Sequence, residues 1–175
     1  MRTVIVLAMH GAPPADFPGD EMKEFFALDN QVGHSHGPSS DHLHQRYVQL
    51  EHKMRTWPRT PDNDPFHAGS RELGASLEKT TGRDVVVGFN EFCAPSVDEA
   101  LDEAVHRGGD RVVVITPMMT RGGEHSEKDI PAAIERARNK HPSIEFTYVW
   151  PFETSRIADF LAEQTRRALD GKRSS

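Results

Sequence analysis

The chain has 175 residues, with 21 Lys and Arg against 27 Asp and Glu, and a formal net charge of −6. This length fits one domain, and an acidic balance without a basic stripe excludes a general nucleic-acid binder. No apolar run approaches the ~18–20 residues of a membrane span, and the run 4–9 is shorter than the ~7–15 residues of a signal-peptide core. Cys93 is the single cysteine, so we expect a cytoplasmic protein without an intramolecular disulfide.

Four short apolar runs predict the strands of one sheet. They cover residues 3–9, 85–89, 111–117 and 144–150. The first three are rich in β-branched residues without polar alternation, which is typical of strands buried on both faces of a parallel sheet. The fourth run alternates, since Glu145 and Thr147 oppose Phe146 and Tyr148, as is expected of an edge strand.

Helices are expected between these strands. Helical periodicity predicts them over residues 65–79, 96–106, 127–140 and 155–169. Ser96 and Glu99 form a capping-box pattern at the start of the second helix, and Phe66, Leu73 and Leu77 are expected to face inward from the first. The alternation predicts an α/β fold of three layers, with a four-stranded, mainly parallel sheet and helices on both faces.

The first crossover is much longer than the others. A helix over 65–79 suffices to connect the first two strands, so residues from about 13 to 64 are predicted to form an insertion within a single domain spanning 1–175. This insertion is rich in Pro, Asp and His and is expected to contain helices near 20–28 and 40–57.

Histidine is concentrated in and beside this insertion. Six of the ten histidines lie within one stretch of 34 residues: His34, His36, His42, His44, His52 and His67. Such enrichment in imidazole indicates transition metals. The insertion is therefore read as a metal relay, as a lid or as an idle solvated segment. The spacing of His42 and His44, two residues apart, weakens the metal reading, because such residues do not share a helix face.

Chemically capable side chains follow three of the predicted strands. His10 comes directly after the first strand, Glu91 after the second, and His125 in the loop that follows the third. Because the carboxyl ends of parallel strands meet at one edge of the sheet, where ligands bind in open α/β folds, these side chains are expected to converge. Two imidazoles and a carboxylate suit Co²⁺, Ni²⁺ or Fe²⁺ and can also move protons.

The loop after the third strand offers further contacts for a ligand. Gly122 and Gly123 give it conformational freedom, and Met118 and Met119 offer an adaptable apolar surface. Arg121 is a candidate contact for an anionic group of a ligand, and a solvated loop arginine is an equal alternative. Cys93 is interpreted as a small buried hydrophobic residue and not as a ligand.

With these residues in place, the sequence resembles the class II chelatases of the CbiX/SirB type, which are sirohydrochlorin cobaltochelatases and ferrochelatases. The resemblance covers residues 1–12 and about 66–170. Its motifs are His10-Gly11 and the stretches 88–101, 112–119, 122–125, 128–131 and 150–152. The family's usual Gly-His-Gly-Ser differs here, because Met9 precedes the histidine and Ala12 replaces the serine.

The resemblance implies a chelatase-like fold and the insertion of a divalent metal into a sirohydrochlorin-type tetrapyrrole, in cobalamin or siroheme biosynthesis. It implies that His10 and His125 handle the metal and the protons, with Glu91 as their acidic partner. The metal is then the substrate, with Co²⁺ expected first and Fe²⁺ and Ni²⁺ as alternatives, and no organic cofactor is needed. The resemblance also implies a homodimer, without a nucleic-acid or membrane partner.

Two other functions are weighed against this one. A phosphoryl-transfer enzyme of the phosphoglycerate-mutase sort also carries His-Gly after its first strand, but it needs an arginine before that histidine, where this chain has Met9. A metal-storage or metal-delivery protein on a chelatase-like scaffold would bind Co²⁺ or Ni²⁺ without metallating a tetrapyrrole, and the fold alone does not separate it from the enzyme.

Overall fold

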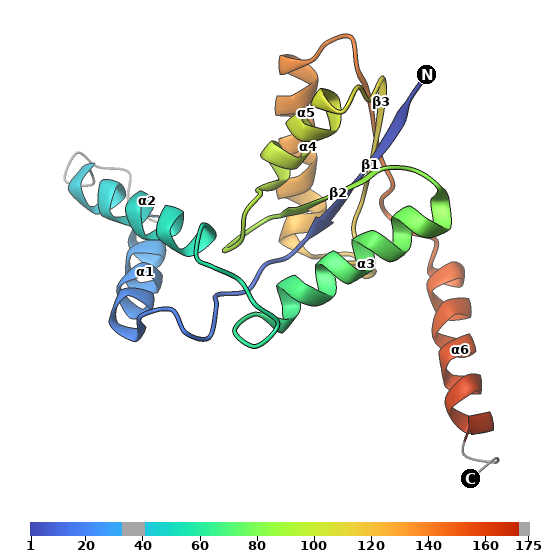
Figure 1. The fold of residues 1–175 in the computed structure, drawn as a ribbon, viewed down its shortest axis with the longest axis horizontal. Coiled ribbons are helices and arrows are strands. Elements are labelled where there is room, and N and C mark those ends of the chain that lie inside the picture. Colours follow the sequence, from blue (N-terminus) through green and yellow to red (C-terminus); the bar gives the residue numbers. More distant parts are fainter. Residues whose placement is uncertain (33–40, 172–175) are drawn as a thin grey trace.

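The computed structural model describes residues 1–32 and 41–171, so His34 and His36 lie outside the described residues. Its centre is a four-stranded parallel sheet in the order β2-β1-β3-β4 (Figure 1). The strands are β1 (Thr3–Met9), β2 (Val85–Phe89), β3 (Arg111–Ile115) and β4 (Glu145–Tyr148). The predicted α/β fold with a parallel sheet is confirmed, although β3 and β4 are shorter than expected.

Two helices cover one face of the sheet, α4 (Val97–His106) and α5 (Ile130–Lys140). Their apolar sides and the strands form a core in which Val6, Leu101 and Ile134 are almost fully buried. The predicted capping box is present at the start of α4. The helix expected over 127–140 becomes regular only at Ile130, because a π-helical turn, η2 (His125–Asp129), precedes α5.

The opposite face carries α3 (Pro65–Thr81), which packs over β2 and β1. The expected inward orientation is wrong for Phe66 and Leu73, whose exposed fractions are 40% and 43%, whereas Leu77 is partly buried against this face. Gly74 explains the difference, because a Cβ there would lie 2.5 Å from a methyl group of Val87. The helix therefore approaches the sheet through its small residues and leaves part of its apolar stripe open.

The long first connection folds into a helical hairpin of α1 (Gly19–Val32) and α2 (Asp41–Arg55). The hairpin stands to one side of the sheet in Figure 1 and has a small core of its own. That core contains Phe17, Phe25, Leu28, Leu50 and Met54.

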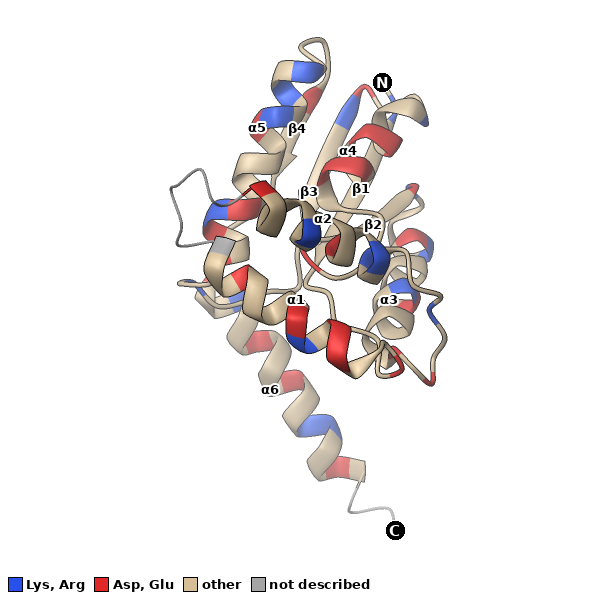
Figure 2. Ribbon diagram, turned by 90° about the vertical axis from the view of Figure 1, so that its left-hand side faces the viewer, with Lys and Arg blue, Asp and Glu red and all other residues tan. Residues whose placement is uncertain are grey.

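The last helix, α6 (Thr154–Gly171), leaves the body of the molecule and has no buried residue (Figures 1 and 2). Charged residues are spread along it (Figure 2), while Phe160, Leu161 and Leu169 are exposed apolar side chains. Within the described ranges, no helix is long and apolar enough to cross a membrane.

Candidate metal centre

Three side chains converge at the carboxyl edge of the sheet, as the sequence predicted. His10, Glu91 and His125 each offer a ligand atom, and these atoms lie within 4.8 Å of one another. The Oε1 atom of Glu91 lies 3.1 Å from Nδ1 of His10 and 3.5 Å from Nε2 of His125. The two imidazole rings meet edge to face, with centroids 4.5 Å apart. One carboxylate is thus shared by two imidazoles, one directly after β1 and the other in the π-helical turn that follows β3.

The loops that carry His10 and Glu91 are fastened to each other. Asn90, the residue before Glu91, donates from its backbone to Met9 and His10 and from its side-chain amide to the carbonyl of Met9 at 2.7 Å. The loops also touch at Gly11, where a Cβ would lie 1.7 Å from the carbonyl oxygen of Glu91. Gly11 is therefore required by this close approach, which explains the His-Gly pair in the sequence.

His125 is oriented by a carboxylate one turn further along. Its Nδ1 atom lies 2.6 Å from Oδ2 of Asp129 within the π-helical turn. An ionised carboxylate only accepts hydrogen bonds, so this pair places the proton on Nδ1 and leaves the lone pair of Nε2 on the side of Glu91. Asp129 is a residue that the sequence analysis missed.

The cluster is open to solvent on one side. The exposed fraction is 48% for the His10 side chain, 34% for Glu91 and 21% for His125. A divalent ion that binds two imidazole nitrogens and a carboxylate oxygen here keeps coordination positions for a further ligand. The same groups can accept protons once the metal has moved on.

The loop of Gly122 and Gly123, which precedes His125, is held by the carboxylate of Glu127. The backbone N–H of Gly122, whose φ is +89°, donates to Glu127 at 2.8 Å, and this bond lowers the pKa of the Glu127 carboxyl. Arg121 is also paired with Glu127, at 3.5 Å, and remains 73% exposed. Gly123 accepts hydrogen bonds from Ser126 Oγ and the Glu127 backbone.

The two methionines of this loop lie against different parts of the molecule. Met118 is partly buried against the core below α4 and α5. Met119 lines an apolar groove on the opposite side, together with Leu73 and Phe152. A contact of these methionines with a flat ligand therefore stays a prediction.

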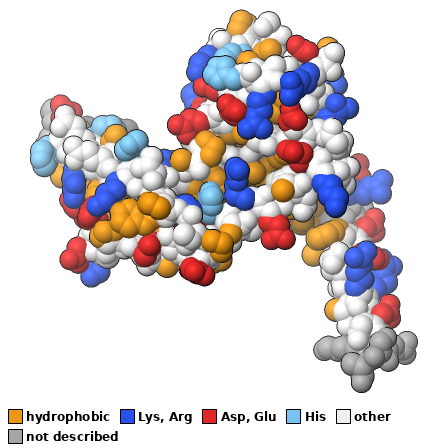
Figure 3. All heavy atoms as spheres, in the orientation of Figure 1, with side chains coloured by type: hydrophobic (Ala, Val, Ile, Leu, Met, Phe, Trp, Pro, Cys, Tyr) orange, Lys and Arg blue, Asp and Glu red, His pale blue; other side chains and the backbone are white. Residues whose placement is uncertain are grey.

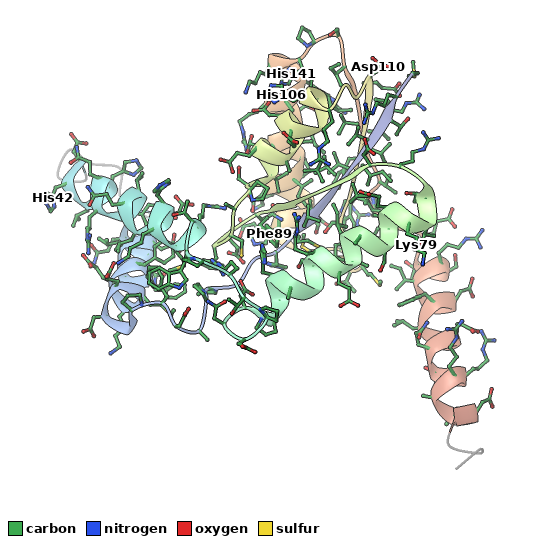
Figure 4. All side chains as sticks on the ribbon, in the orientation of Figure 1. His42, Lys79, Phe89, His106, Asp110 and His141 are labelled. Carbon is green, nitrogen blue, oxygen red and sulfur yellow. The ribbon has the colours of Figure 1, made fainter. Side chains whose placement is uncertain are left out.

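The histidines of the hairpin do not join the cluster in the part of the chain that the structure describes. His42, His44 and His52 lie exposed along α2, and His42 lies near the end of α2 that is distant from the sheet (Figure 4). His67, on α3, stacks on Phe89 with ring centroids 5.2 Å apart, and burial lowers the pKa of its imidazole. Cys93 is fully buried, as expected, and burial raises the pKa of its thiol.

Comparison with known proteins decides the family. The CbiX family model matches residues 66–168, which include Glu91 and His125. The chain belongs to the CbiX family. A sirohydrochlorin cobaltochelatase of Sulfolobus acidocaldarius is 36% identical over 85 residues, which are 49% of this chain and 67% of that protein. Another, from Priestia megaterium, is 43% identical over 63 residues, which are 36% of this chain but only 20% of that protein.

The CbiX fold is also seen in a solved structure. The crystal structure of a CbiX protein of cobalamin (vitamin B12) biosynthesis from Marinobacter aquaeolei superposes with a TM-score of 0.51. The sequences are 18% identical, and the superposition covers 96% of this chain and 98% of that one. At this identity the likeness shows the shared fold.

Proposed function

We propose that this CbiX-family chain inserts a divalent metal, Co²⁺ in the first place, into a sirohydrochlorin-type tetrapyrrole on the way to cobalamin or siroheme. The observation that carries the proposal is the sharing of the Glu91 carboxylate by His10 and His125 at an open edge of the sheet. The metal is a substrate in this reaction. The relatives named sirohydrochlorin cobaltochelatase support the choice of tetrapyrrole.

The reaction exchanges two pyrrole protons for one divalent ion, so the site must release a metal and take up protons at the same place. His10 and His125 hold the ion through imidazole nitrogens, which bind first-row metals reversibly. Glu91 balances the charge of the incoming ion. As the ion leaves for the macrocycle, Glu91 accepts one of the two pyrrole protons and a freed imidazole accepts the other. Asp129 keeps His125 in the tautomer that offers Nε2.

We further propose that residues 13–64 form an insertion in a single domain that spans 1–175. The family match begins at residue 66, after the hairpin has ended. The hairpin also has its own core, which is distinct from the two cores of the sheet.

The working form is proposed to be a homodimer joined through α6. The groove lined by Leu73, Met119 and Phe152 continues to Ile157 and Phe160 at the start of α6, and hydrophobic side chains lie at this junction in Figure 3. Each copy thus has one apolar groove and one helix with an uncovered apolar side. Two copies related by a twofold axis cover both features at once.

The dimer is tested by light scattering after size-exclusion chromatography. Leu161→Glu places a charge on the apolar side of α6 and is expected to give a monomer. Arg166→Glu, on the charged side of the same helix, introduces the same residue and is expected to remain dimeric. A wild-type monomer would contradict the proposed dimer.

The activity is tested by mixing the protein anaerobically with sirohydrochlorin and Co²⁺, Ni²⁺ or Fe²⁺ while the visible spectrum is followed. The spectrum of the metallated product is expected to appear with Co²⁺ faster than without protein. His106→Ala, an exposed histidine on α4, serves as the control and is expected to behave as wild type. Tight Co²⁺ binding without any spectral change would instead favour metal storage or delivery.

A further inference from the structure

The loop after β2, which carries Glu91, has an unusual backbone conformation at the residue that follows Glu91. Phe92, the next residue, has φ of +59°, in the left-handed region that side chains other than glycine seldom adopt. Its ring packs between the hairpin and the sheet, with centroids 6.1 Å from Phe25 and 6.0 Å from Phe26 of α1. Such a conformation persists only where surrounding contacts impose it.

Arg55, at the end of α2, makes several of these contacts. Its guanidinium donates to the carbonyls of Asn90 and Cys93, at 3.1 and 2.9 Å, on either side of Glu91. Its own carbonyl accepts the backbone N–H of Ala94 at 3.1 Å. The side chain is 20% exposed and is braced by Glu51 one turn earlier on the helix.

Arg59 connects the same loop to the loop that follows His10. It donates to the carbonyl of Phe92 at 2.6 Å and to that of Ala12 at 2.7 Å. The guanidinium also forms an ion pair with Asp64. The Arg59 and Asp64 side chains are 7% and 1% exposed, respectively. A guanidinium has five donors in one plane, so it can fix several carbonyls at once.

Both arginines come from the segment before residue 66, where the family match begins. The end of α2 approaches the sheet at this loop in Figure 1. We propose that Arg55 and Arg59 are positioning residues for Glu91, which they hold at ligand distance from His10 and His125 by fixing the backbone around it. This inference rests on the proposed metal centre. It means that the end of the hairpin helps to position a metal ligand, since residues that orient the ligands also tune the metal affinity.

Arg46 offers a matched control on the same helix. It forms a bidentate pair with Glu24 of α1, at 2.8 and 2.7 Å. This pair joins the two helices of the hairpin. Arg46→Ala therefore removes a comparable interaction from α2 while the contacts of Arg55 to the loop of Glu91 remain.

The test measures Co²⁺ binding to the full chain by titration calorimetry, together with KM for Co²⁺ and kcat of metal insertion. Arg55→Ala is expected to weaken Co²⁺ binding by about tenfold and to raise KM for Co²⁺ more than it lowers kcat. Arg55→Lys, which keeps one donor group, is expected to recover part of the loss. Arg46→Ala is expected to bind Co²⁺ as the wild type does, even if its melting temperature falls as far as that of Arg55→Ala.

A double variant separates positioning from general destabilisation. If Arg55 acts through Glu91, then Arg55→Ala should add little to the loss already caused by Glu91→Gln. The inference is overturned if Arg55→Ala binds Co²⁺ like the wild type, if Arg46→Ala is equally impaired, or if the Arg55 effect persists in full beside Glu91→Gln. The rate of tetrapyrrole metallation, measured in parallel, reports on the proposed function separately.

Discussion

Both ends of the sheet bring an imidazole to a carboxylate, but the surroundings differ. Near the amino ends of the strands, where Figure 4 labels His141, that imidazole pairs with Asp102 of α4 at 2.8 Å, and the ammonium of Lys140 binds the same carboxylate. Burial alone would raise the pKa of Asp102, but the bonds from Lys140 and His141 outweigh it and lower that pKa. At the carboxyl end, a second imidazole takes the place of the ammonium beside Glu91.

This difference separates a structural pair from a candidate site. A carboxylate bound to a permanent cation is already neutralised and has little affinity left for a metal. A carboxylate between two imidazoles keeps its negative charge available for a divalent ion, and the three side chains can offer ligand atoms to that ion together. An imidazole next to a carboxylate is therefore weak evidence of function, whereas two imidazoles that share one carboxylate are stronger evidence.

The largest effect is expected at the imidazoles of the carboxyl end. His125→Ala should lower the rate of metal insertion on the order of 10²–10⁴-fold, because a positioned proton acceptor and metal ligand is lost. His10→Ala should behave alike, and the double variant should be little worse than either, since the two act as one unit. Stopped-flow absorbance at saturating Co²⁺ measures these rates.

His141→Ala removes the imidazole at the other end and serves as the control. It should reduce the melting temperature while the insertion rate stays near that of the wild type. Equal losses of rate for His125→Ala and His141→Ala would contradict the distinction between a candidate metal site at the carboxyl end and a structural pair at the amino end.

A smaller effect is expected at the carboxylates that orient each imidazole. Asp129→Asn should weaken Co²⁺ binding by about 10–100-fold, because an amide carries no charge and can donate as well as accept, so it no longer fixes the tautomer of His125. Asp102→Asn makes the same change beside His141 and should leave Co²⁺ affinity unaltered. Titration calorimetry measures the Co²⁺ affinity of both variants. An unchanged affinity in Asp129→Asn would show that the π-helical turn orients His125 without this carboxylate.

The ion pairs of Asp102, at the amino ends of the strands, should make the stability of the fold depend on pH. The folded-state pKa of Asp102 is lowered from its ordinary value of 3.8. Its pairing therefore stabilises the fold above that value, and the contribution is lost as the pH falls through the lower folded pKa. The melting temperature of the wild type should exceed that of Asp102→Asn at about pH 7, and the gap should shrink at about pH 3. A gap that widens in acid would contradict the sign of this shift.

The smallest effect is expected at the exposed histidines of α2. Replacement of His42, His44 and His52 by alanine should leave the insertion rate unchanged at saturating Co²⁺, because these residues do not belong to the cluster at the rim. The Co²⁺ concentration at half-maximal rate should also be unchanged. A rise in that concentration alone would indicate a metal relay, and a lower maximal rate would indicate a lid.

The positions of the strands and the convergence at the rim were predictable from sequence. The run 3–9 is apolar on both faces, which is typical of a strand in a parallel sheet that helices cover on both sides. Once the strands are parallel, topology alone brings His10, Glu91 and His125 to one edge. No detailed geometry was needed for these predictions, which is why they were confirmed.

The support around the site was not predictable in the same way. Asp129 was missed because the helix was expected to begin after His125, whereas the π-helical turn includes both residues. Arg55 and Arg59 bind backbone carbonyls, which leave no trace in the sequence. Leu73 was expected to face inward because an apolar stripe does not reveal whether it meets the sheet or a groove left open beside it.

His10, Glu91 and His125 are proposed to form the metal site. The most direct test is a crystal of the protein soaked with Co²⁺ and measured on both sides of the cobalt absorption edge. An anomalous difference peak is expected within bonding distance of Nε2 of His125, of a ring nitrogen of His10 and of a Glu91 oxygen. A peak among the histidines of α2, with none at the rim, would contradict the proposal.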